Sequence, residues 1–96
     1  MAMLISLYCI DNPDSLELRM KCRPDHVAYL VKHADIIVYA GPLLDDAASN
    51  PIGSLLIIEV PRREFADDFS LNDPYTQAGL FAEVSIRPIC QVFPKT

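Results

Sequence analysis

Among the residues that could perform chemistry, His26 and Asp73 form the most informative combination. Histidine has an unperturbed pKa of about 6.5, so near neutral pH it both takes up and releases a proton. An aspartate bonded to one ring nitrogen fixes the tautomer and leaves the other nitrogen free to act as a base. Such a pair suits isomerisation or elimination, which needs no nucleophile. The alternative is that Asp73 only caps a helical turn and His26 is an ordinary polar residue of a helix.

Two residues near this pair in the sequence could contact a substrate. Arg23 could bind a carboxylate or phenolate through its guanidinium group, or it could form a solvated salt bridge with Asp25 or Glu17. Tyr75 could donate a hydrogen bond to the substrate or simply form part of the pocket wall.

Three residues at the ends of the expected strands complete the candidate site. Gly41 and Pro42 most simply make a turn at the end of a strand, although the missing side chain of the glycine could also leave space for a ligand. Ser54 could donate a hydrogen bond from the start of the next strand. The expected partner is therefore a small molecule.

Other reactive residues favour neither a metal nor a cofactor. His33 follows His26 by seven residues, or roughly 10 Å along a helix at about 1.5 Å per residue, too far for one metal ion. His33 is better explained as a helix C-terminal residue favoured by the dipole. Cys22 could pair with His26 as a thiolate and imidazole, but Pro24 between them disturbs the geometry, and a buried thiol is the alternative. The sequence contains no nucleotide-binding glycine loop, HExxH motif or nucleophile elbow.

The composition describes a small acidic chain. Its 96 residues suit one domain, 1–96, and 51% of them are hydrophobic. The net charge is −5 and no basic run is longer than Arg62-Arg63, so neither nucleic acid nor a membrane surface is an expected partner. The apolar run 1–10 is too short to span a membrane. Three cysteines without CxxC spacing indicate a reducing cytoplasm; Cys9 and Cys90 are expected in strands of the core.

The residue pattern predicts alternating strands and helices. The expected elements are, in order, strand 4–10, helical segment 15–33, strand 36–40, surface loop 43–51, strand 54–60, a helix from Pro61 to about residue 71, a capped turn at 73–79 and strand 81–93. The first strand is hydrophobic almost throughout, which suggests a central position. Pro88 implies an edge or a bulge in the last strand.

Helical periodicity in 15–33 predicts which side faces the core. The apolar positions are Leu16, Met20, Val27, Leu30, Val31 and Ala34. Charged residues of the segment, Arg19 among them, are expected to point elsewhere. Pro24 either begins a second helix or kinks one long helix.

The order β-α-β-β-α-β predicts a ferredoxin-like α+β fold with an antiparallel sheet and both helices on one face. The other face carries apolar residues that no helix covers. Two copies packed face to face would cover both sheets, so we expect a homodimer with barrel-like α/β packing, or a higher assembly of such dimers.

Four motifs in this order resemble the YCII-related family: RPDHVAYL at 23–30, AGPL at 40–43, Gly53-Ser54, and DPYTQAGLF at 73–81. The resemblance spans almost the whole chain and implies a ferredoxin-like dimer with an active site centred on His26 and Asp73. That family is similar in fold to muconolactone isomerases, and at least one relative is a lyase that removes chloride from a chlorinated hydroxyquinol. Asp45-Asp46 and Arg62-Arg63 depart from the family pattern and leave the choice of substrate open.

Two functional hypotheses follow. The leading one is an enzyme that uses His26 and Asp73 for acid–base isomerisation or elimination on a small cyclic or aromatic organic acid, without cofactor or metal. The other is a non-catalytic module in which the same pocket binds a small ligand.

Overall fold

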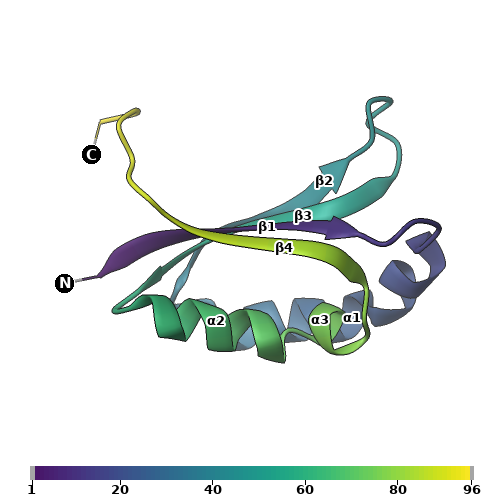
Figure 1. Ribbon diagram of the computed structural model, residues 1–96, viewed down its shortest axis with the longest axis horizontal. Coiled ribbons are helices and arrows are strands. Elements are labelled where there is room, and N and C mark those ends of the chain that lie inside the picture. The colour runs from purple at the N-terminus through teal and green to yellow at the C-terminus, as the bar shows by residue number, and fades with distance from the viewer. Residues whose placement is uncertain (1, 96) are drawn as a thin grey trace.

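The computed structural model describes residues 2–95. Four antiparallel strands form one sheet in the order β2-β3-β1-β4, and three helices lie together against one of its faces (Figure 1). The elements follow one another as β1 (Met3–Asp11), α1 (Leu16–Lys32), β2 (Ile37–Leu44), β3 (Pro51–Val60), α2 (Arg63–Asn72), α3 (Pro74–Gln77) and β4 (Phe81–Ile89). This arrangement confirms the predicted ferredoxin-like α+β fold.

The core lies between the two central strands and α2. Strand β1 pairs with β3 on one side and β4 on the other, as its hydrophobic sequence predicts. The buried core side chains are Ile5, Leu7, Cys9, Leu56, Ile58, Val60, Ala66 and Phe69. On each strand they occupy alternate positions facing the helices, because successive side chains of a strand point to opposite faces.

Helix α1 is continuous through Pro24, which settles the two alternatives in favour of one long helix. The prediction of which residues of this helix face the core is wrong in part. Met20 is 54% and Val31 71% exposed, whereas Arg19 is 4% and His26 8% exposed. The side of α1 that faces the sheet therefore carries polar groups, whose burial depends on partners that hydrophobic periodicity does not reveal.

Strand β2 does not end at Gly41-Pro42 as predicted but continues to Leu44. Pro42 pairs with Ser54 in the register of the sheet. Proline is tolerated here because β2 is an edge strand, so its missing amide hydrogen breaks no hydrogen bond on the free side. Since β3 begins at Pro51, the predicted loop 43–51 shrinks to the turn 45–50.

Two further boundaries differ from prediction. Helix α2 begins at Arg63, so Pro61 precedes the helix and does not open it. Strand β4 ends at Ile89 and places Pro88 on an edge strand, as expected, opposite Ile5. Cys90 lies beyond the strand and is exposed, so its assignment to the core is wrong. The pairing of β1 with β4 ends at Leu4 and Ile89, and in the described residues beyond Ile89 no further pairing follows.

The short helix α3 has the predicted capped form. The side chain of Asp73 accepts a hydrogen bond from the backbone N–H of Tyr75 at 2.9 Å, and Pro74 occupies the first helical position. Gly79 follows the turn with a φ of 74°, a conformation that glycine adopts without strain. This cap determines where the Asp73 carboxylate lies.

Cys9 makes stability sensitive to alkaline pH. Burial raises the pKa of its thiol from 9.0 to about 12, and the Asp73 charge acts in the same direction. Since the folded protein holds this proton more tightly than the unfolded chain does, the stabilisation is complete below pH 9 and is lost as the pH rises toward 12. Between about pH 8 and pH 10.5 we expect the free energy of unfolding of the wild type to fall by about 2 kcal/mol relative to Cys9→Ala.

Urea denaturation of both proteins at the two pH values measures this difference, and ionisations that both proteins share cancel. Cys90→Ala removes an exposed thiol and serves as the control, for which the difference from wild type stays constant with pH. A constant difference for Cys9→Ala as well would contradict the prediction.

Candidate active site

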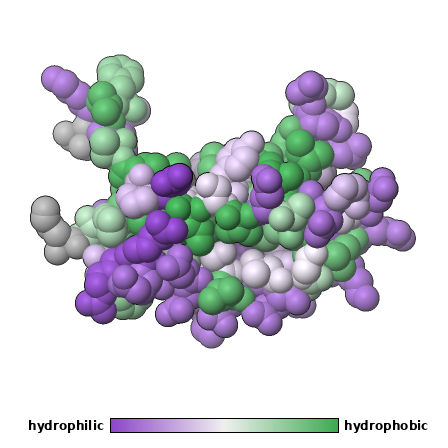
Figure 2. All heavy atoms as spheres, in the orientation of Figure 1, coloured by the Kyte–Doolittle hydropathy of each residue, from purple (hydrophilic) through white to green (hydrophobic). Residues whose placement is uncertain are grey.

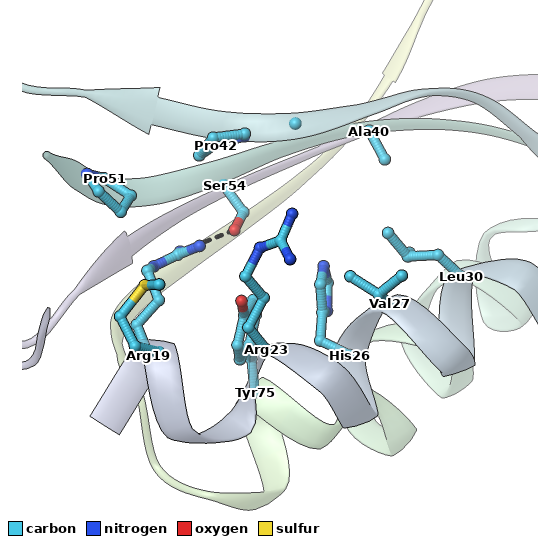
Figure 3. A pocket seen from close by; sticks show the side chains of 12 residues that line it. Arg19, Arg23, His26, Val27, Leu30, Ala40, Pro42, Pro51, Ser54 and Tyr75 are labelled. Carbon is cyan, nitrogen blue, oxygen red and sulfur yellow. Dashed lines mark hydrogen bonds between the residues drawn. The ribbon is translucent and has the colours of Figure 1, made fainter. Parts of the chain in front are cut away.

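A cavity of about 330 Å³ lies between α1 and the β2–β3 side of the sheet (Figure 3). Much of its wall is apolar, contributed by Met20, Val27, Leu30, Ala40, Pro42 and Pro51. Its polar lining comes from Arg19, Arg23 and His26 on α1, Ser54 on β3 and Tyr75 on α3. An apolar cavity with a few converging polar groups is typical of a site for a small organic molecule.

The structure brings His26 and Asp73 into contact. The Nδ1 atom of His26 lies 2.8 Å from Oδ1 of Asp73, and both residues are buried. Because an ionised carboxylate only accepts hydrogen bonds, Nδ1 carries the proton of this bond, and in the neutral ring Nε2 then carries the lone pair. Figure 3 shows the outer ring nitrogen of His26 directed into the cavity. The geometry is that of a base held in one tautomer.

Tyr75 fixes the plane of this imidazole. Its ring stacks on the ring of His26 with 3.9 Å between centroids and 15° between planes, and its side chain is buried. Its backbone N–H donates to Oδ1 of Asp73, the atom that also accepts from His26. Burial raises the pKa of the Tyr75 phenol, although the charges of Arg19 and Arg23 act against it. The hydroxyl therefore remains a protonated donor at neutral pH.

Arg19 and Asp11 form a buried ion pair that the sequence analysis missed. Arg19 donates from Nε to Oδ2 of Asp11 at 2.8 Å and from Nη2 to Oδ1 at 3.0 Å. The same Nη2 donates to the hydroxyl oxygen of Ser54 at 2.8 Å (Figure 3). The guanidinium carbon lies 4.7 Å from the centre of the Tyr75 ring. Helical spacing could have revealed the role of Arg19, because Arg19, Arg23 and His26 follow one another at intervals of four and three residues and so share one face of a helix.

The ion pair keeps Arg19 charged inside the protein. Burial lowers its pKa, but the hydrogen bonds and charge of Asp11, together with Tyr75, outweigh burial and raise the pKa overall. The neighbouring Cys9 has a raised pKa and stays a thiol, so it is no nucleophile at neutral pH.

Arg23 reaches the cavity without a carboxylate partner. Its side chain rises from α1 between Ser54 and His26 in the close view of Figure 3. Within residues 2–95, neither Asp25 nor Glu17 forms a salt bridge with it. Arg23 therefore brings an uncompensated positive charge to the cavity.

The remaining predicted residues occupy the strand wall. Pro42 and Ser54 lie opposite each other on β2 and β3, and both line the cavity. Gly41 also borders it, but a Cβ at Gly41 would lie 2.8 Å from the hydroxyl of Tyr39. Tyr39 neighbours Ala40, a cavity residue, and so points to the opposite sheet face. The missing side chain of Gly41 therefore accommodates Tyr39 rather than a ligand.

Two other predicted groups lie apart from this centre. His33 bonds through Nδ1 to the backbone oxygen of Tyr29 at 2.9 Å, near the end of α1. Cys22 is half-buried, and in the described part of the chain it neither lines the cavity nor bonds to His26. Residues 2–95 contain no cluster of three His, Cys, Asp or Glu side chains placed to hold a metal ion. Across the same residues, no helix is long and apolar enough to cross a membrane.

Solved structures similar to this chain include one close in sequence and one distant in sequence. The 5-chloro-2-hydroxyhydroquinone dehydrochlorinase TftG from Burkholderia phenoliruptrix AC1100, solved with 2,5-dihydroxybenzoquinone, superposes with a TM-score of 0.84 at 35% identity, covering 88% of this chain and 91% of that one. Rv0793 from Mycobacterium tuberculosis has a TM-score of 0.56 at 12% identity and 100% coverage of both chains. The second likeness shows the fold alone.

The sequence itself has close relatives. Protein YciI of Escherichia coli O6:H1 is 36% identical over 98 residues, covering 95% of this chain and 100% of the relative. An uncharacterized protein of Haemophilus influenzae is 32% identical over 96 residues, covering 91% and 96% of the two chains. The model of the YCII-related domain matches residues 3–90. The chain therefore belongs to the YCII-related family.

Proposed function

We propose that this protein is a small enzyme in which His26 and Asp73 catalyse proton transfer on a small cyclic or aromatic organic acid. The observation that carries the proposal is the 2.8 Å bond between His26 Nδ1 and Asp73, which leaves Nε2 directed into the cavity. The similar structure of TftG supports the class of ligand, because that protein is a dehydrochlorinase solved with a dihydroxybenzoquinone.

The groups around the cavity suit an elimination or an isomerisation. An acidic oxygen of the substrate binds at Arg23, while the ring packs against apolar residues such as Val27 and Leu30. Nε2 of His26 removes a proton, and Asp73 stabilises the imidazolium that forms. The electron pair of the broken bond expels a leaving group in an elimination. In an isomerisation, His26 returns the proton to another atom of the substrate.

Loss of the base should abolish turnover without unfolding the protein. We expect His26→Gln to lower the rate of chloride release from 5-chloro-2-hydroxyhydroquinone by roughly 10²- to 10⁴-fold, the usual contribution of a general base. Chloride release and the quinone absorbance measure the rate, and circular dichroism checks the fold. His33→Gln is the matched control, since His33 caps the C-terminal end of the same helix outside the cavity, and its rate should equal that of the wild type.

A folded His26→Gln protein with the full rate would refute the assignment. A wild-type protein that binds 2,5-dihydroxybenzoquinone, yet releases no product from halogenated or isomerisable phenols and cyclic acids, would favour the binding-module alternative. In a binding module, the hydrogen bond between His26 and Asp73 would only orient the imidazole toward the ligand.

The charge of Asp73 should matter more than its hydrogen bonds. Asp73→Asn keeps an oxygen that can accept from the Tyr75 N–H, so the cap of α3 and the melting temperature should change little. The amide cannot stabilise the imidazolium and permits the opposite tautomer of His26, so kcat should fall at least about 100-fold. Steady-state kinetics and thermal unfolding measure both effects. Similar kcat values for Asp73→Asn and wild type would exclude a catalytic role for the carboxylate.

We also propose that the uncovered face of the sheet is the contact surface between two copies. Its apolar residues include Tyr8, 47% exposed, which pairs with the half-buried Leu55. Hydrophobic groups extend along the upper side of the sheet in Figure 2, and the segment after β4 rises on the same side in Figure 1. That segment exposes Val92 by 80% and Phe93 by 83%. A face-to-face dimer would bury all of these groups.

A charge placed in this face should separate the copies. We expect Leu55→Lys to be a monomer while the wild type is a dimer, because a buried lysine without a partner opposes packing of the two sheets. Light scattering after size-exclusion chromatography gives the mass. Leu71→Lys, at a position 60% exposed on α2, is the control and should leave the mass unchanged. A wild-type protein that is already monomeric would end this proposal.

A further inference from the structure

Arg19 directs three of its five N–H donors, those on Nε and Nη2, to protein groups. Its Nε–H and one Nη2–H bind Asp11, and the second Nη2–H binds the hydroxyl oxygen of Ser54. Side-chain exposures of 5% for Arg19 and 6% for Asp11 show that the pair is almost completely removed from water. A buried ion pair of this kind contributes little net stability compared with apolar residues of the same volume. Its presence beside the cavity therefore calls for a role other than stabilising the fold.

The hydroxyl of Ser54 is the group on which this ion pair acts. A serine hydroxyl has one proton to donate and lone pairs that accept. Arg19 occupies the acceptor side of Ser54 at 2.8 Å, so the proton must point away from Arg19. Ser54 is 3% exposed and lines the cavity, and within residues 2–95 its hydroxyl donates to no acceptor. A proton of a buried hydroxyl without an acceptor is available to a ligand.

We infer that the Arg19–Asp11 pair is a positioning device that holds the Ser54 hydroxyl as a hydrogen-bond donor to an oxygen of the substrate. Ser54 touches the substrate, whereas Arg19 and Asp11 act on it only through Ser54. Asp11 fixes the guanidinium plane through two parallel hydrogen bonds, a geometry that lysine cannot reproduce. This inference rests on the proposed use of the cavity as a substrate site.

The same arrangement defines the class of substrate. The strand side of the cavity offers the Ser54 hydroxyl, and Arg23 and Tyr75 add donors next to it. His26 Nε2, on the other side of Arg23, is the one basic lone pair among the described residues that line the cavity. A ring whose oxygens accept hydrogen bonds, such as a phenolate, an enolate or a quinone, satisfies these donors. An amine would leave buried donors without partners, at a cost in affinity.

Binding of 2,5-dihydroxybenzoquinone, followed by calorimetry and by its visible absorbance, tests the inference directly. Loss of one hydrogen bond to a charged or polarised oxygen should raise Kd about tenfold in Ser54→Ala. In Asp11→Asn/Arg19→Gln both charges are removed together, so no unpaired charge is buried and the protein should fold. We expect this double variant also to raise Kd about tenfold, because the Ser54 hydroxyl is then no longer oriented.

Combining the variants distinguishes positioning from a structural role. If Arg19 and Asp11 act through Ser54, adding Asp11→Asn/Arg19→Gln to Ser54→Ala changes Kd no further. A purely structural ion pair would give additive losses and overturn the inference. Arg62→Gln/Glu64→Gln removes an exposed ion pair and is the control, with Kd equal to that of the wild type. If the amide pair does not fold, Asp11→Leu/Arg19→Met replaces it, since apolar side chains need no partners.

The experiment also separates this inference from the proposed reaction. All binding measurements are repeated in His26→Gln, which lacks the base but retains Ser54, Arg19 and Asp11. A tenfold effect of Ser54→Ala on Kd in that background supports the positioning device even if no substrate is turned over. Wild-type protein that shows no saturable binding of the quinone at millimolar concentration overturns the substrate class. An unchanged Kd in Ser54→Ala overturns the donor role.

Discussion

Helix α1 packs on the core through Tyr29 and Leu30 and is fixed in position by buried polar contacts, on which the candidate site depends. The buried residues of this helix are Arg19 and His26. Arg19 links the helix to Asp11 of β1 and Ser54 of β3, while His26 links it to Asp73 at the start of α3. Each of these bonds also places a group in the wall of the cavity. A change that loosens the helix from the sheet therefore disturbs the base and the donors together.

Helices α2 and α1 have different roles: α2 contributes to the core, whereas α1 contributes to the candidate site. Helix α2 buries Ala66 and Phe69 against the core strands, as an ordinary amphipathic helix does. Helix α1 instead leaves apolar residues such as Met20 and Val31 exposed and turns Arg19 and His26 inward, while its other charged residues remain exposed. A chain of 96 residues has a thin core, so polar groups buried on this scale replace apolar packing that would otherwise stabilise it. Such a concentration of buried polar groups is typical of a functional site.

The order of strands and helices could be predicted from short-range patterns, because apolar runs, prolines and capping residues act locally. The course of β2 through Gly41-Pro42 could not, since only its position at the edge of the sheet makes the proline tolerable. The sequence predicted that Arg19 faces water, because charged residues are seldom buried, whereas the structure buries it. The contact of His26 with Asp73, 47 residues apart, was expected through the family resemblance and not through spacing.

The two ends of the cavity differ in charge. Asp11 compensates Arg19, so the pair adds little net charge, whereas Arg23 has no carboxylate partner within residues 2–95. At the other end, the negative charge of Asp73 lies behind His26. The charge of Arg23 favours an anionic oxygen at the exposed end, and because charges interact more strongly where water is excluded, the buried Asp73 favours a positive charge on the imidazole. In the proposed reaction, the substrate oxygen lies at Arg23 while His26 gains a proton, so one electrostatic arrangement both orients the ligand and favours its deprotonation.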